Sequence, residues 1–167
     1  MTDKEKLGKL EEDKFEKYLK LAKTQGCIQN YERTTQTVLD YQDKIDFYIY
    51  LDNIKYSVDV KAGKINDPNI ISINFTAKDG STGTLGCSKA DFIAVHGFYE
   101  GIGRYYFIRK DILWNHIIRQ NFPLKTNGKS AWYEVPLSDL TTRWAFWINC
   151  FGFLWETSYF NCRRFIK

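Results

Sequence analysis

The sequence predicts an α/β domain in which a mixed central sheet of four or five strands is flanked by helices. A long amphipathic stretch at the start of the chain has the period of a helix, and the segments after it alternate between apolar and polar residues with the period of strands. The chain has 167 residues, of which 44% are hydrophobic and 17% aromatic, enough for a sizeable core. We therefore expect a single domain over residues 1–167.

The first expected element is a helix over Asp3–Thr24, which ends at Gly26. Apolar residues recur along it at three- and four-residue steps. These positions are Leu7, Leu10, Phe15, Tyr18, Leu19 and Ala22. On a helical wheel Glu12 lies at the edge of the apolar face, Glu11 nearer its centre and Glu16 opposite it. For each glutamate the alternative is an ordinary solvated helix charge.

A hairpin is expected next. A first strand over Cys27–Arg33 leads through a polar connection into a strand over Lys44–Leu51, and a further strand covers Ile54–Ala62. Asp52 and Asn53, between these last two strands, are typical of a tight turn.

The middle of the chain supplies the rest of the sheet. Asn69–Phe75 has strand character, and the glycine-rich segment Asp79–Gly86 is typical of a loop. Ser88–His96 is expected to be a helix end or turn that leads into a central strand, with Arg104–Arg109 as its neighbour. Asp111–Arg119 is expected to form a short helix.

The C-terminal part, about 111–167, carries one more strand and a cluster of aromatic residues. Tyr133–Leu137 is expected at a sheet edge, because Pro136 has no backbone N–H to donate. Between Trp144 and Phe160 large aromatic side chains are dense. Core packing is the leading explanation, a homodimer interface is next, and base stacking is third.

Composition excludes several classes of protein. The cysteines Cys27, Cys87, Cys150 and Cys162 form no Cys-x-x-Cys pair, so neither a zinc site nor a disulfide framework is expected. His96 and His116 are isolated, and we expect structural roles for both. With neither a signal peptide nor a membrane-spanning stretch in evidence, the expected location is the cytoplasm.

The net charge of +4 is only mildly basic, so nucleic-acid binding would depend on where the cations lie. Several fall in or just after the hairpin half of the chain, where they would contact phosphates or simply be solvated. They are Lys61, Lys64, Lys78, Lys89, Arg104, Arg109 and Lys110.

Acids on the two hairpin strands indicate a site that can hold a divalent metal. Asp46 interrupts the first apolar run, and Asp59, Val60 and Lys61 close the second. Desolvating a carboxylate is costly unless a cation or hydrogen bonds compensate. The two carboxylates and the Val60 carbonyl are suitable ligands for Mg²⁺ or Mn²⁺. Lys61 would orient the attacking water, help to deprotonate it, or neutralise charge on a phosphate.

These residues resemble the PD-(D/E)xK nuclease superfamily, in which an acid on one strand is followed by Asp/Glu-x-Lys on the next. Asp46 matches the first acid, and Asp59-Val60-Lys61 matches the rest, whereas Ile45 stands in the place of the motif's proline. Asp59 follows Asp46 by thirteen residues, a spacing similar to that of archaeal Holliday junction resolvases and related phage nucleases.

The first helix extends the resemblance. Gly8, Glu12 and Phe15 match the Gly-xxx-Glu-xx-Phe opening of several families in this superfamily, which implies that Glu12 joins the metal site. The segment from Asn69 to Val95 also looks like a group of phage nucleases. There Lys89 would contact a phosphate, with a turn-stabilising role as the alternative.

The resemblance covers about 8–110 and implies a restriction-endonuclease-like core. It also implies a metal-dependent DNA endonuclease of phage or mobile-element origin, active in the host cytoplasm. Asp46, Asp59 and Glu12 would surround Mg²⁺ or Mn²⁺, with Lys61 beside the water. A junction resolvase would need a symmetric dimer, whereas a restriction-like or nonspecific enzyme would need groove-reading loops, for which 64–86 is available. The alternative is a noncatalytic DNA-binding or assembly protein that keeps the fold.

Overall fold

A computed structural model of the chain describes residues 3–34, 43–61, 70–76, 84–99, 102–128, 130–136, 138–139 and 145–147. Several of the features singled out in the sequence lie outside these ranges. They are Lys64, Lys78, Cys150, Cys162, the segment 79–83, and the aromatic region except for residues 145–147. The single-domain prediction and the roles expected for those residues stay predictions.

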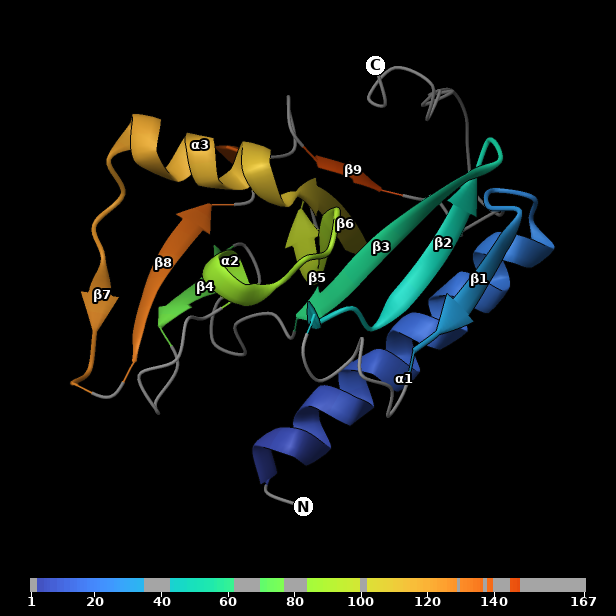
Figure 1. The fold of residues 1–167 in the computed structure, drawn as a ribbon, viewed down its shortest axis with the longest axis horizontal. Helices are drawn as coiled ribbons and strands as arrows, with labels where there is room; N and C mark the ends of the chain where they lie inside the picture. The colour runs from blue at the N-terminus through green and yellow to red at the C-terminus, as the bar shows by residue number, and fades with distance from the viewer. Residues whose placement is uncertain are drawn as a thin grey trace.

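A six-stranded sheet runs through the described residues in the order β1-β2-β3-β5-β6-β9 (Figure 1). β3 and β5 are parallel, and the other neighbours are antiparallel. The predicted mixed α/β architecture is confirmed, with six strands in this sheet in place of four or five. The strands are β1 Asn30–Arg33, β2 Phe47–Leu51, β3 Ile54–Lys61, β5 Phe92–Tyr99, β6 Ile102–Arg109 and β9 Ala145–Trp147.

The hairpin of β2 and β3 has the predicted turn. Asp52 and Asn53 have φ angles of 49° and 64°. Two consecutive positive φ values are what a type I′ turn requires, and Asn and Asp tolerate them better than most residues. The two strands pair in register from this turn. Asp46 and Asp59 therefore come side by side at the far end of the hairpin.

Helix α1, Asp3–Thr24, has the predicted bounds and packs on one face of the sheet (Figure 1). Gly26, with φ 70°, follows its end. The residues that contact the sheet are fully buried: Phe15, Leu19 and Ala22. Leu7 and Leu10 are 53% and 51% exposed, because the first turns of the helix extend beyond the strands.

The opposite face of the sheet is covered by helix α3, Lys110–Gln120, and by a second, three-stranded sheet in the order β4-β8-β7. Leu113 and Ile117 of α3 are buried in this second core. Its other members come from β5, β6 and the small sheet. The small sheet consists of β4 Ile70–Thr76, β7 Lys125–Thr126 and β8 Ala131–Pro136.

The edge position predicted for Tyr133–Leu137 is wrong, because β8 is the middle strand of the small sheet. β7 is so short that it pairs only with Trp132 and Ala131, at the start of β8. Pro136 lies at the other end, where it pairs with Ile70 of β4. No donor is needed there on the β7 side, so the proline is tolerated.

Two further elements refine the sequence-based expectations. Helix α2, Thr84–Cys87, begins inside the segment expected to be a loop. β5 is a central strand with β6 beside it, as predicted. β9, from the aromatic region, pairs with β6.

The described helices include none with the length and apolarity that a membrane span requires.

Candidate metal and catalytic site

Asp46 lies just before β2, and hydrogen bonds hold it from both sides. Thr34 N–H donates to its carbonyl oxygen at 3.0 Å, and its own N–H donates to Val58 O at 2.9 Å. The carboxylate is fixed as well, because Val60 N–H donates to Asp46 Oδ2 at 2.6 Å. The side chain is therefore tied to β3, as the hairpin predicts.

Asp59 is fully buried in β3 and contacts Lys61. Lys61 Nζ donates a hydrogen bond to Asp59 Oδ1, while the lysine side chain keeps 30% exposure. Asp59 Oδ2 is buried and has no hydrogen-bond partner in the part of the chain that the structure describes. An unsatisfied buried carboxylate oxygen is costly. That oxygen is a natural ligand for a cation.

The charges in this cluster perturb one another. Burial, reinforced by the charge of Asp59, raises the pKa of Asp46 to about 7. Burial alone would lower the pKa of Lys61, but the charges of Asp59 and Asp46 outweigh it and raise that pKa. Lys61 is therefore an ammonium ion at neutral pH, and its single charge does not fully compensate two carboxylates.

Glu12, the glutamate that the resemblance selects, is bound by Arg33 at the end of β1. Arg33 Nη2 donates to Glu12 Oε2 at 2.8 Å, and Nη1 donates to Asp13 and Glu16 at 2.7 and 3.0 Å. The charge of Glu12 also raises the pKa of Asp46, by less than burial and the charge of Asp59 do. Glu12 and Asp46 are therefore electrostatically coupled. The expectation that Glu16 lies opposite the packed face is wrong, because it reaches the Arg33 of β1 beside the helix.

Glu11, which lies nearer the centre of the apolar face, has a different partner. Tyr105 of β6 donates its hydroxyl to Glu11 Oε1 at 2.7 Å, and the glutamate side chain is only 12% exposed. Burial, together with this hydrogen bond to Glu11, raises the pKa of Tyr105. Glu11 thus satisfies a half-buried hydroxyl over the sheet.

The predicted site is brought together in part. Asp46, Asp59 and Lys61 converge at one end of the hairpin, whereas the Glu12 carboxylate is held by Arg33. Within the described ranges no three His, Cys, Asp or Glu side chains form a group that could hold a metal. The oxygen ligands that do converge nevertheless suit a hard divalent cation, because one buried carboxylate oxygen has no hydrogen-bond donor within the described part of the chain and the neighbouring acid has a raised pKa.

The segment before β5 packs against this end of the hairpin. Ser57 N–H and Oγ both donate to Asp91 Oδ2, at 2.8 and 2.7 Å. Lys89 N–H donates to Asp43 O at 2.8 Å, and its ammonium pairs with Asp43 at 2.7 Å. Lys89 therefore takes part in the turn, which is one of the two roles foreseen for it, while its side chain stays 70% exposed.

Sequence reasoning missed two contributors to the site. Thr34 donates its hydroxyl to Ile45 O and its N–H to Asp46 O, and Arg33 binds Glu12. No sequence signal marks Thr34. For Arg33 a signal existed, because an arginine at the end of a strand followed a helix crowded with acids.

No family model matches this sequence, and no curated protein matches it. Among solved structures, the chain is similar to one described as a nuclease from a fusselovirus, with 20% sequence identity and a TM-score of 0.46. The match covers 84% of this chain and 89% of the other. A likeness at this level assigns neither an activity nor a ligand to the present protein.

Proposed function

We propose that this protein is a metal-dependent nuclease that hydrolyses phosphodiester bonds in DNA. The observation that carries the proposal is the Asp46 and Asp59 pair on adjoining strands, with Lys61 on one Asp59 oxygen and no donor on the other among the residues that the structure describes. Structural ion pairs are normally satisfied on both sides. An acid pair left short of positive charge is what a cation-dependent site requires.

Mg²⁺ or Mn²⁺ fits the donors, which are the carboxylates of Asp46 and Asp59 and the carbonyl oxygen of Val60. Arg33 binds Oε2 of Glu12, and we assign Oε1 to the metal as well. When bound, the metal supplies a water of lowered pKa and stabilises negative charge on the phosphate. The Val60 N–H on Asp46 Oδ2 fixes the direction of that carboxylate.

Lys61 acts as a cation in this proposal. Its raised pKa keeps the ammonium protonated, so it donates hydrogen bonds and cannot accept a proton. Of the three roles foreseen for it, orienting the water and neutralising charge on the phosphate are therefore favoured over removing a proton. The Lys61 side chain as a whole keeps 30% exposure.

The test is incubation of the protein with supercoiled, linear and four-way-junction DNA, in Mg²⁺, in Mn²⁺ and in EDTA. We expect cleavage of at least one substrate, and only with metal. Preference for the junction would identify a resolvase, and its absence a restriction-like or nonspecific enzyme. Equal cleavage in EDTA would refute the mechanism.

The noncatalytic DNA-binding or assembly protein is the second candidate, and one observation favours it. Among the described residues Glu12 is bound to Arg33 through Oε2, and no three His, Cys, Asp or Glu side chains form a group that could hold a metal. DNA binding with no metal-dependent cleavage of any substrate would favour this candidate. The homodimer expected through the aromatic region stays a prediction, for which sedimentation at micromolar concentration is the measurement.

A further inference from the structure

A hollow of about 530 Å³ is lined by residues from the turn end of β3, from the start of β5 and from the start of α3. Its volume is in the range of sites that bind small ligands or one unit of a larger one. Cations and apolar side chains line it together. Those that matter here are Ile54, Tyr56, Lys89, Phe92, Arg109 and Lys110.

Three of the cations singled out in the sequence meet at this hollow from separate elements. Lys89 precedes β5, Arg109 ends β6 and Lys110 begins α3. α3 starts without a side-chain cap, so the positive end of its dipole adds to the same rim. Positive charge from separate elements therefore converges on one concave place.

The three cations face two acids that also line the hollow, Asp91 and Asp111, and Lys89 is paired with Asp43 as well. Asp91 accepts two hydrogen bonds from Ser57 on one oxygen, so that oxygen is directed toward β3. Asp111 pairs with Arg109 at 2.8 Å, but the two side chains are 58% and 51% exposed. Exposed ion pairs contribute at most about 1 kcal/mol. A phosphate would therefore recruit the Arg109 guanidinium at little cost.

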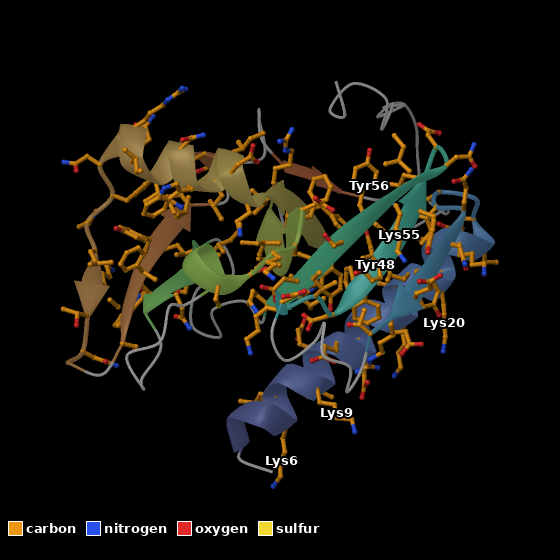
Figure 2. All side chains as sticks on the ribbon, viewed as in Figure 1. Lys6, Lys9, Lys20, Tyr48, Lys55 and Tyr56 are labelled. Carbon is orange, nitrogen blue, oxygen red and sulfur yellow. The ribbon has the colours of Figure 1, made fainter. Side chains whose placement is uncertain are left out.

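One wall of the hollow is aromatic. Tyr56 packs edge-on against Phe92, with ring centroids 5.5 Å apart, and Ile54 beside it is 48% exposed. Figure 2 labels Tyr56 in the upper part of the view. It also labels Lys20, on α1 to the lower right, which serves below as a control residue. An aromatic surface next to cations is the combination that binds nucleic acid, through base or sugar contact and phosphate pairing.

The hollow adjoins the proposed active site. Lys89 pairs with Asp43, three residues before Asp46, and also lines the hollow. Tyr56 precedes Asp59 by three residues on β3. Their side chains point to opposite faces of the sheet, because side chains alternate along a strand, so the link between the hollow and the acid pair is β3 itself.

We propose that this hollow binds the sugar-phosphate backbone of DNA beside the proposed active site, with Arg109 and Lys89 on phosphate and Tyr56 on the adjoining sugar or base. The inference rests on the proposed function for its orientation toward Asp46 and Asp59. Binding itself is measurable without cleavage, so the two ideas can fail separately.

The test measures affinity by fluorescence anisotropy in EDTA, with labelled duplex and labelled four-way-junction DNA. Arg109→Gln and Lys89→Gln are each expected to weaken binding about 3- to 10-fold and to reduce the slope of log K against log salt by about 1. Lys20→Gln is the matched control, because Lys20 is 65% exposed and pairs with Glu16 at 3.7 Å on α1. It removes the same charge and should change affinity less than about 1.5-fold.

Tyr56→Leu keeps an apolar contact to Phe92 and should weaken binding about 5-fold or more through loss of the ring. Circular dichroism checks that each variant folds. Equal losses for Arg109→Gln and Lys20→Gln, or no loss for either, would overturn the proposal. Weaker binding by Arg109→Gln with no wild-type cleavage would retain the hollow and reject the nuclease. Unchanged binding by Arg109→Gln, with metal-dependent cleavage by the wild type, would reject the hollow and retain the nuclease.

Discussion

Two clusters of charge at the same end of the hairpin differ in how their carboxylate oxygens are hydrogen-bonded. In the first cluster Arg33 binds the acids Glu12, Asp13 and Glu16, and the hydrogen bond from Arg33 lowers the pKa of Asp13. In the second, Lys61 binds one oxygen of Asp59, the other oxygen has no donor among the described residues, and burial raises the pKa of Asp46 to about 7.

The difference separates a structural network from a site that lacks a cation. A guanidinium presents five donors in a fixed plane, so one Arg33 serves several carboxylates. An ammonium is a single point charge, and the Asp59 side that Lys61 does not reach is left open. Both clusters hold more acid than base, but the pKa of Asp13 is lowered in the first and the pKa of Asp46 is raised in the second. The predictions below test whether that contrast marks the site.

The largest effect is expected for Asp59→Asn, which should reduce cleavage below detection while DNA binding persists. The amide keeps the volume of the side chain but removes ligand charge at Oδ2, for which the described residues supply no donor. Nicking of supercoiled DNA in Mg²⁺ is the measurement, with circular dichroism as the check on folding. Cleavage at the wild-type rate by this variant would place the metal elsewhere.

Lys61→Ala should lower turnover by about 10² to 10⁴ and leave DNA affinity nearly unchanged, because a charge-stabilising group is lost. Lys61→Arg should restore little, since a planar guanidinium does not fit the place of a compact ammonium on Asp59. Single-turnover cleavage and anisotropy separate the two quantities. A variant that loses affinity but keeps its rate would make Lys61 only a phosphate contact.

The contrast between the clusters is sharpest at Glu12 and Glu16, which share Arg33 as a partner. If Glu12 also serves the metal, Glu12→Gln should weaken Mn²⁺ binding by about 10- to 100-fold. Glu16→Gln loses an equivalent ion pair and should change Mn²⁺ affinity less than about 2-fold. Calorimetric titration of Mn²⁺ without DNA is the readout. Equal effects from both variants would assign Glu12 to the structural network.

The hairpin was predictable because its signals are local. Alternation with a period of two defines β2 and β3, and Asp52 with Asn53 specifies the turn, so the meeting of Asp46 and Asp59 follows from short-range pattern alone. Helix α1 was predictable for the same reason, from its apolar period and Gly26.

What could not be predicted depends on contacts between distant parts of the chain. Arg33 and Glu12 are 21 residues apart, and their pairing requires β1 to lie along α1. Pairing of β4 with β8 joins segments about sixty residues apart, which no local pattern specifies. The rule that placed Pro136 at an edge failed because β7 is too short to reach it.

The smallest expected effect tests whether the Asp46 and Asp59 pair is strained without metal. Burial raises the pKa of Asp46 to about 7 in the folded protein, against about 3.9 when unfolded. The folded state therefore binds more protons, and the stability that this proton contributes is full below about pH 4 and lost as pH rises to about 7. In EDTA, Asp46→Asn should resemble wild type near pH 4 and be more stable at pH 8.

A gain of roughly 1 kcal/mol is expected, or about 3 °C in Tm, because relaxation and water penetration reduce the cost of a buried charge. Thermal unfolding in EDTA across this pH range is the measurement. Glu32→Gln is the opposing control, because hydrogen bonds from Tyr50 and Lys55 lower the pKa of Glu32, so that neutralising it should give no gain at pH 8. If Asp46→Asn is instead less stable than wild type at pH 8, the acid pair is already neutralised within the chain, and the case for a cation at Asp59 Oδ2 loses its electrostatic basis.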